Sequence, residues 1–214
     1  MNKKKGWENF YLLSSGGKNI LFSYLSPWNQ TYQGWTLAEY AKAMHKDEID
    51  ALMDLLISEQ GTGGGIYFLM SEVNIRKKIK LPYVSFCTDE DAYQPIGLMS
   101  QRHPHPRAYG TFPRILGRYV REEKVITLEE AVRKASALPA FVLGLRNRGL
   151  VKPKYAADLV IFDAHSIGDR ASYLQPHQYP SGIRFVLVNG KIVLENGQLT
   201  GALPGKALFR GIRD

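Results

Sequence analysis

The stretch 46–89, "KDEIDALMDLLISEQGTGGGIYFLMSEVNIRKKIKLPYVSFCTD", decides the fold class of this chain. Apolar residues at helical spacing, acids in the first turn and a glycine at the end predict a helix over 46–61. The short apolar segments 66–70 and 83–89 predict strands covered on both faces, with a helix from Ser71 to the Leu81-Pro82 stop between them. Strands that alternate with helices predict βα units and a parallel sheet.

The flanking sequence extends this pattern on one side and ends it on the other. Towards the N-terminus, 20–25 predicts another strand, and Thr36 with Glu39 forms a capping box that begins a helix. Towards the C-terminus, Thr127 and Glu130 repeat that capping box. Beyond residue 149, two Asn-Gly pairs predict hairpin turns, since both residues of such a turn need positive φ. We therefore expect a (β/α) domain over 1–148 and a β appendage over 149–214.

Composition narrows the class of protein. The 214 residues carry 28 Lys and Arg against 20 Asp and Glu, a formal charge of +8 that favours anionic partners. A single cysteine excludes an internal disulfide framework. No apolar run is long enough for a membrane helix, and no signal-peptide pattern follows the Lys-rich start, which we read as a solvated tail. These features predict a soluble, cytoplasmic protein with no membrane partner.

The segment 101–123, "QRHPHPRAYGTFPRILGRYVREE", is open to three interpretations: a metal site, an anion-binding site or only a basic loop. His103 and His105 have metal-like spacing, but each precedes a proline, which favours a loop, and an isolated H-x-H is a weak zinc signal. The arginines that follow at helical spacing, Arg114, Arg118 and Arg121, are typical of a solvated face or of pairs with Glu122 and Glu123. No stacking platform accompanies them, so we expect no nucleic-acid binding, and an anion-binding module is the weaker alternative.

Asp89 is the strongest single candidate for chemistry. It ends a predicted buried strand, where barrel enzymes place catalytic groups, and a carboxylate there needs a metal or cation partner. The alternative is that Asp89 caps the following turn. Cys87, two residues earlier, is expected to be a small buried apolar residue rather than a nucleophile.

Two long stretches carry a resemblance to a known family. Residues 103–163, "HPHPRAYGTFPRILGRYVREEKVITLEEAVRKASALPAFVLGLRNRGLVKPKYAADLVIFD", and 176–205, "PHQYPSGIRFVLVNGKIVLENGQLTGALPG", resemble the C-terminal part of the D-aminoacylase (N-acyl-D-amino-acid deacylase) family of the amidohydrolase superfamily. The resemblance implies α/β architecture: the C-terminal portion of a (β/α)8 TIM-type barrel followed by a small β sandwich. A whole barrel takes about 250 residues, so only its last strands are expected here.

The resemblance also implies roles for individual residues. Asp89, in "TD" where the family has "SD", corresponds to the base that activates a metal-bound water and then protonates the leaving amine. Arg107 corresponds to the arginine of the family's "HPR" motif, which suits bidentate binding of the substrate carboxylate. His103 and His105 are then expected to shape this loop. Glu90 and Asp91 depart from the family pattern and leave substrate choice open.

The implied activity is zinc-dependent hydrolysis of the amide of N-acyl-D-amino acids or dipeptides. The family's other zinc ligands have no counterpart here, so Asp89 could join a metal site only with ligands from outside this chain, and the chain alone is not expected to hold Zn²⁺. We expect it to need an N-terminal half, in the same longer chain or as a separate one. The alternative is a truncated, non-catalytic fragment that self-associates or pairs with such a half.

Overall fold

A computed structural model describes residues 8–209, so the Lys-rich start lies outside the described residues. The chain forms two compact units, each built from segments far apart in the sequence. Unit 1 comprises the chain up to Ser71 with Ala92–Pro106 and Ser172–His177. Unit 2 comprises Glu72–Asp91, Arg107–Ala171 and the chain from Gln178 onward. The division at residue 148 stays a prediction.

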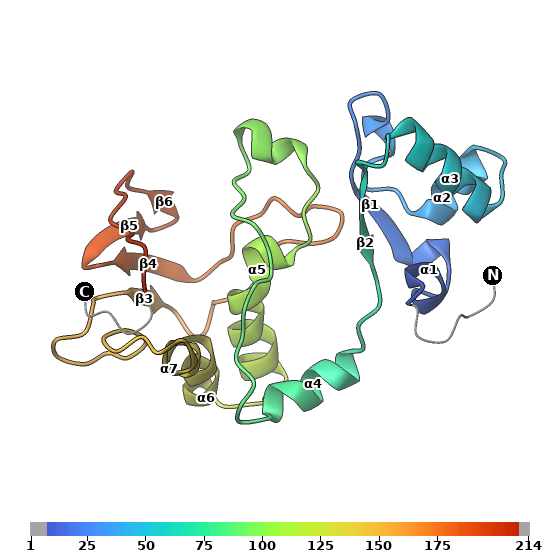
Figure 1. Cartoon of the computed structure of the whole chain (residues 1–214). Helices are drawn as coiled ribbons and strands as arrows, with labels where there is room; N and C mark the ends of the chain where they lie inside the picture. Colours follow the sequence, from blue (N-terminus) through green and yellow to red (C-terminus); the bar gives the residue numbers. More distant parts are fainter. Residues whose placement is uncertain (1–7, 210–214) are drawn as a thin grey trace. The chain divides into compact units, whose positions relative to one another are not determined.

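Unit 1 is a small helical layer against one strand pair (Figure 1). Its core is apolar and comes from β1, α2 and α3, with Leu37 and Ala51 fully buried. In chain order its elements are α1 (Phe10–Leu13), β1 (Ile20–Tyr24), α2 (Leu37–Ala43), α3 (Glu48–Ser58) and β2 (Gly64–Tyr67), with 3-10 turns at Gly17–Asn19, Gln30–Tyr32 and Gly97–Gln101.

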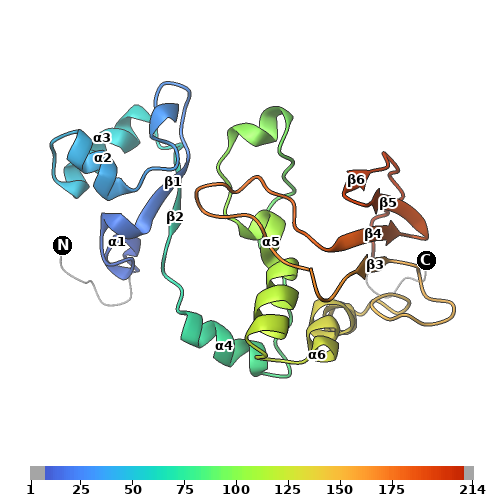
Figure 2. The same ribbon diagram turned by 180° about the vertical axis from the view of Figure 1, so that it is seen from behind.

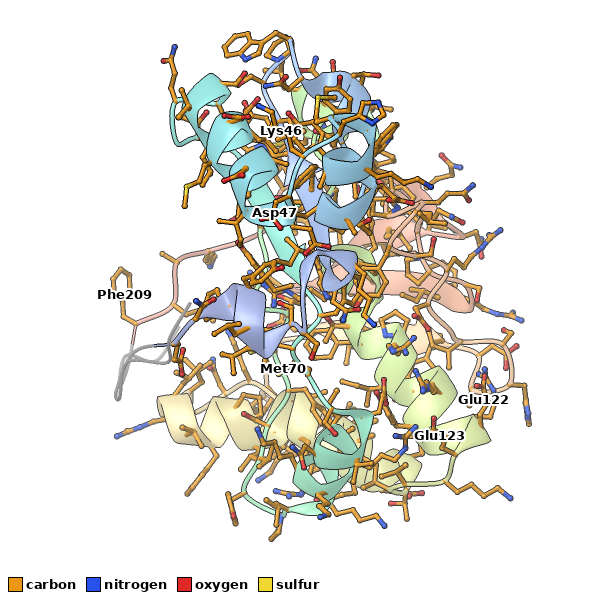
Figure 3. All side chains as sticks on the ribbon, turned by 90° about the vertical axis from the view of Figure 1, so that its right-hand side faces the viewer. Lys46, Asp47, Met70, Glu122, Glu123 and Phe209 are labelled. Atoms are coloured by element: carbon orange, nitrogen blue, oxygen red, sulfur yellow. The ribbon has the colours of Figure 1, made fainter. Side chains whose placement is uncertain are left out.

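Local signals predicted α2 and α3 of unit 1 correctly, whereas α1 was not predicted. The Thr36 hydroxyl accepts a hydrogen bond from the Glu39 amide at 3.2 Å, and the Glu39 carboxylate accepts one from the Thr36 amide at 2.7 Å. This capping box begins α2. Asp47, which is labelled in Figure 3, caps α3: its carboxylate accepts a hydrogen bond from the Ile49 amide at 2.9 Å. Each helix therefore starts where a side chain satisfies a free amide.

The predicted parallel pairing is wrong for the strands in unit 1. β1 pairs antiparallel with β2, with Ile20 opposite Tyr67 and Leu21 opposite Ile66. β2 also begins earlier than expected, because Gly64 and Gly65 of the glycine-rich run already pair with β1. Only Ile66 of this strand is buried, so the expectation of a strand covered on both faces fails as well.

Unit 2 combines a helical part with an antiparallel sheet. The helical core packs Ile79, Ile115, Tyr119 and Ala131 together. In chain order the elements are α4 (Glu72–Lys80), α5 (Arg107–Arg114), a π-helical continuation (Ile115–Glu122), α6 (Leu128–Val132), a second π-helical segment (Arg133–Ala137), α7 (Leu138–Leu143), β3 (Leu159–Phe162), β4 (Ile183–Val188), β5 (Lys191–Glu195) and β6 (Gln198–Leu199).

The C-terminal hairpins were predicted correctly. β3, β4, β5 and β6 lie in sequence order in one antiparallel sheet (Figure 2). Asn189-Gly190 joins β4 to β5, and Asn196-Gly197 joins β5 to β6, with all four residues at positive φ. Antiparallel strands therefore follow residue 149 as expected, whereas neither the β sandwich nor the barrel portion is confirmed, and a separate β domain stays a prediction.

The segment 83–89, predicted as a third parallel strand, runs without a ladder in the structure. A strand needs a neighbour to pair its amides and carbonyls, and within residues 8–209 the two sheets are both antiparallel and exclude this segment. Its side chains alternate between exposed and half-buried. Cys87 is on the exposed side, so its predicted burial is wrong, because no second layer covers it.

Within residues 8–209, no helix has the length and the apolar run needed to cross a membrane.

Candidate functional site

Asp89 stands at a bend at the end of the 83–89 segment. Its backbone φ of 48° is left-handed, a conformation that Asp tolerates better than most residues. The side chain is 82% exposed. A chain that continued in extended form would point residues 89 and 90 to opposite faces, so the bend at Asp89 is what brings consecutive carboxylates together.

Arg107, the first residue of α5, contacts the carboxylates of both Asp89 and Glu90. Its Nη2 lies 3.4 Å from Asp89 Oδ2, and its Nε donates a hydrogen bond to Glu90 Oε2 at 2.9 Å. The structure therefore brings together the two residues singled out for chemistry and adds Glu90, whose side chain is only 14% exposed. Sequence reasoning noted Glu90 as a departure from the family pattern but assigned it no partner.

The helix that carries Arg107 is held firmly to the rest of unit 2. Arg114, at the end of α5, donates to Asp169 at 3.0 Å. A side chain at Gly110 would place its Cβ 2.9 Å from the Cβ of Asp169, so only glycine permits this close approach. One face of α5 is thus fixed, and Arg107 projects from the helix's N-terminal end.

Lys134, which the sequence analysis missed, supports the 83–89 segment. It is fully buried, and its ammonium group donates to the carbonyls of Ile79 and Leu81 at the end of α4. Its own carbonyl accepts from the Phe86 amide at 3.2 Å, and its Nζ lies 6.0 Å from the centre of the Phe86 ring. Burial lowers the pKa of Lys134. Its place three residues after buried Ala131, on the same helical face, was the available signal.

His103 and His105 belong to unit 1, whereas Asp89 and Arg107 belong to unit 2. His103 contacts the Tyr173 carbonyl through its ring, and its amide donates to Ser23 at 2.8 Å. The His105 ring lies 3.2 Å from the Tyr173 hydroxyl. Both histidines join the 102–105 loop to the 172–177 loop within unit 1, and their role in shaping the loop of Arg107 stays a prediction.

The arginines at helical spacing, Arg114, Arg118 and Arg121, form ion pairs with acidic side chains, as their spacing predicted. Arg118 and Arg76 each donate from Nε to Glu123 at 2.7 Å, and Arg121 pairs with Glu122 at 2.9 Å. Glu122 and Glu123 end this helical segment (Figure 3). The hydrogen bonds from Arg76 and Arg118 lower the pKa of Glu123 to about 2. Because these guanidinium groups are already paired with carboxylates, they argue against an anion-binding module.

A metal site is not assembled by this part of the chain. Among residues 8–209, no group of three or more His, Cys, Asp or Glu side chains converges as metal ligands. Protein zinc sites take three or four such ligands. Asp89 is instead paired with a cation, Arg107. The residues present therefore do not fit a zinc ion by themselves.

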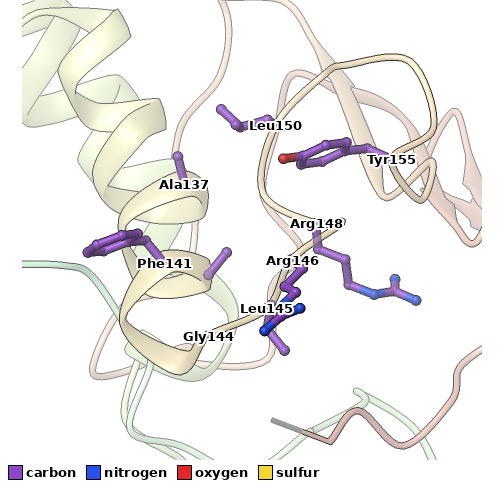
Figure 4. A pocket seen from close by; sticks show the side chains of 9 residues that line it. Ala137, Phe141, Gly144, Leu145, Arg146, Arg148, Leu150 and Tyr155 are labelled. Carbon is purple, nitrogen blue, oxygen red and sulfur yellow. The ribbon is translucent and has the colours of Figure 1, made fainter. Parts of the chain in front are cut away.

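Unit 2 has a surface hollow whose lining residues do not include the candidate site residues. It has a volume of about 480 Å³ and is lined by α7 and the loop that follows, including Phe141, Arg148 and Tyr155 (Figure 4). Neither Asp89 nor Arg107 belongs to its lining. Arg148 in turn donates to Asn189 Oδ1 at 2.7 Å, so it ties the loop to the β sheet.

Comparison with known proteins supports the expected relationship. The sequence profile described as "Amidohydrolase family" matches residues 94–194. The N-acyl-D-glutamate deacylase of Alcaligenes xylosoxydans xylosoxydans is 40% identical over 83% of this chain and 34% of its own length. The D-aminoacylase of the same organism is 35% identical over 83% and 34%.

A solved structure agrees with these sequence matches. The N-acyl-D-glutamate deacylase of Bordetella bronchiseptica, in complex with zinc and a phosphonate inhibitor, superposes with a TM-score of 0.73 at 33% identity. The match covers 87% of this chain and 37% of that one. The chain thus spans about a third of the length of these relatives. It belongs to the amidohydrolase family, as a relative of D-aminoacylase and the N-acyl-D-amino-acid deacylases.

Proposed function

We propose that this chain contributes a base and a carboxylate anchor to a hydrolase of N-acyl-D-amino acids. The observation that carries the proposal is the 3.4 Å approach of Arg107 Nη2 to Asp89 Oδ2. A deacylase of this kind needs a proton acceptor close to a group that binds the substrate's α-carboxylate, because the cleaved amide and that carboxylate are attached to the same carbon. Relatives named for this activity support the assignment.

Asp89 has the exposure that a base requires. With 82% of its side chain open, it can take the proton of an attacking water and return it to the departing amine. Arg107, 42% exposed, offers a planar guanidinium that pairs with a carboxylate through two parallel hydrogen bonds. In this proposal the substrate carboxylate replaces Asp89 at Nη2, which frees Asp89 to act as base.

Zinc enters this proposal only with ligands from outside the chain. The relative from Bordetella bronchiseptica was solved in complex with zinc. Because the described residues do not form a metal site, we propose that a polypeptide equivalent to the remainder of the relatives supplies the other ligands. It would be part of the same longer chain or a separate N-terminal half.

Exposed apolar residues support the association part of the proposal. In α7, Phe141 is 82% exposed, and Val142 and Leu143 follow it with more than half of their surface open. Contiguous exposed apolar residues favour contact with another polypeptide. Self-association of a non-catalytic fragment is the second candidate. Sedimentation velocity of the purified chain, with and without a co-expressed N-terminal two thirds of a relative, separates the two.

The first test measures the chain by itself. Elemental analysis for zinc is run beside hydrolysis of N-acetyl-D-glutamate with and without added Zn²⁺. We expect neither stoichiometric metal nor turnover. Stoichiometric zinc with turnover that Asp89→Asn abolishes would show that the chain completes its own site, against the proposal that ligands come from outside.

The second test restores the missing part. A chimera joins this chain to the N-terminal two thirds of the N-acyl-D-glutamate deacylase. We expect the chimera to hydrolyse an N-acetyl-D-amino acid. The substitution Asp89→Asn should lower kcat by about 10²–10⁴-fold, as for loss of a general base. The substitution Arg107→Lys should raise KM by roughly tenfold, because lysine lacks the planar guanidinium that pairs with a carboxylate through two hydrogen bonds. Asp91→Asn is the control. A chimera that folds by circular dichroism but is inactive, or an Asp89→Asn variant as active as the control, contradicts the proposal.

A further inference from the structure

We propose that Glu90 is a positioning residue that holds Arg107 through Nε and sets how readily Nη2 passes from Asp89 to a substrate carboxylate. The inference rests on the proposed function of Arg107 and concerns a residue to which the family resemblance gives no role. It starts from the difference between two adjacent carboxylates. Glu90 is 14% exposed and makes the shorter contact, 2.9 Å, whereas Asp89 is 82% exposed and lies at 3.4 Å.

Burial decides which of the two carboxylates holds the guanidinium. The interaction of a shielded ion pair is screened less by water and ions than that of an open pair. Glu90 also uses Nε, the nitrogen nearest the side-chain stem, so its bond fixes the plane of the guanidinium. The Asp89 contact is longer, open to solvent and made by a terminal nitrogen. Glu90 is therefore the permanent partner of Arg107, and Asp89 the exchangeable one.

Charge gives Glu90 a second effect. Two carboxylates beside one guanidinium leave a local charge of about −1, which opposes the approach of a third carboxylate. Removing the charge of Glu90 while keeping its shape should strengthen carboxylate binding at Arg107. Removing the whole side chain should release the guanidinium from its fixed plane. The substitutions Glu90→Gln and Glu90→Ala separate these two effects.

The experiment follows Arg107 directly, on the full 214-residue chain and without any need for turnover. Phenylglyoxal modifies guanidinium groups, and peptide mass spectrometry gives its rate at each arginine. We expect Arg107 to react at least threefold faster in Glu90→Gln and faster still in Glu90→Ala. Asp91→Asn, a neighbouring exposed carboxylate, should leave the rate unchanged. Arg118, held by Glu123, is the internal control in every digest.

Protection by N-acetyl-D-alanine gives the readout that a merely structural role would not produce. In Glu90→Gln the half-protective concentration should fall at least threefold, since a competing negative charge is gone, whereas in Glu90→Ala it should not fall. An Arg107 rate in Glu90→Gln equal to that of Asp91→Asn overturns the proposal, as does a half-protective concentration in Glu90→Gln that is unchanged or higher. A faster rate in Glu90→Gln with no protection in any variant supports the Glu90–Arg107 bond but overturns the substrate-binding role of Arg107.

Discussion

The Lys134 ammonium group lies 2.5 Å from the carbonyl oxygen of Leu81, and none of the lysine side chain reaches solvent. Leu81 directly follows α4, and its carbonyl also accepts from the Val84 amide at 3.2 Å. The same ammonium group donates to the carbonyl of Ile79 in the last turn of α4, where helix carbonyls lack intrahelical partners. The same lysine binds the Phe86 amide through its carbonyl. One residue of the α6–α7 region thus fixes both the end of α4 and the segment that leads to Asp89.

Lys134→Ala should strongly destabilise unit 2. The Ile79 carbonyl would lose its ammonium donor, whereas the Leu81 carbonyl would keep the Val84 amide, and we expect a loss of about 1–3 kcal/mol in the free energy of unfolding. Urea denaturation followed by circular dichroism measures it. Lys80→Ala, at an exposed position in the last turn of α4, is the control and should cost less than about 0.5 kcal/mol. Equal effects of the two substitutions would contradict the capping role of Lys134.

Glu123 should make the stability of unit 2 sensitive to acid. Hydrogen bonds from Arg76 and Arg118 hold its pKa at about 2 instead of 4.5. Because the folded-state pKa is the lower one, the contribution to stability is complete above pH 4.5 and is lost as the pH falls towards 2. Glu123→Gln should remove this part of the acid dependence in urea unfolding between pH 5 and pH 2.5. Glu122→Gln, which changes a more exposed ion pair, should leave the dependence as in the parent chain.

Tyr11 should titrate far above the ordinary pKa of a tyrosine, 10.0. Its hydroxyl donates to the Glu48 carboxylate at 2.7 Å, and this bond raises the pKa of Tyr11 to about 12. The folded-state pKa is the higher one, so the stabilisation is present below pH 10 and is lost as the pH rises through 12. The difference in tyrosinate absorbance between the parent chain and Tyr11→Phe isolates this group. Glu48→Gln should lower its midpoint by more than one unit, and Asp50→Asn, on the same helix, should shift it little.

Gly182 and Gly201 offer a matched pair for backbone strain. Both have φ near +80°, but a Cβ at Gly182 would lie 2.5 Å from the backbone of Ile167, whereas one at Gly201 would meet nothing within 4 Å. Gly201→Ala should cost about 1 kcal/mol from the left-handed conformation alone. Gly182→Ala should cost roughly 1–3 kcal/mol more, because neighbouring backbone must move. Similar losses in urea denaturation would show that the contact at Ile167 is easily relieved.

The sequence by itself determined the features whose signals act over a few residues. The Thr36–Glu39 capping box, the start of α3, the bounds of α4 and the two Asn-Gly hairpins all depend on hydrogen bonds or φ preferences within about four positions. Asp89 and Arg107 were selected by their motifs, and the family relationship followed from the same stretches.

Only the tertiary structure decided how distant segments meet. Apolar runs predicted strands at 66–70 and 83–89, but their pairing partners lie far away in the chain, so β2 is antiparallel to β1 and the 83–89 segment has no ladder. The exposure of Cys87, the burial of Lys134 and the joint contact of Asp89 and Glu90 with Arg107 follow from that packing. Such contacts close long loops, and their direction and register are therefore set by the whole fold rather than by local preference.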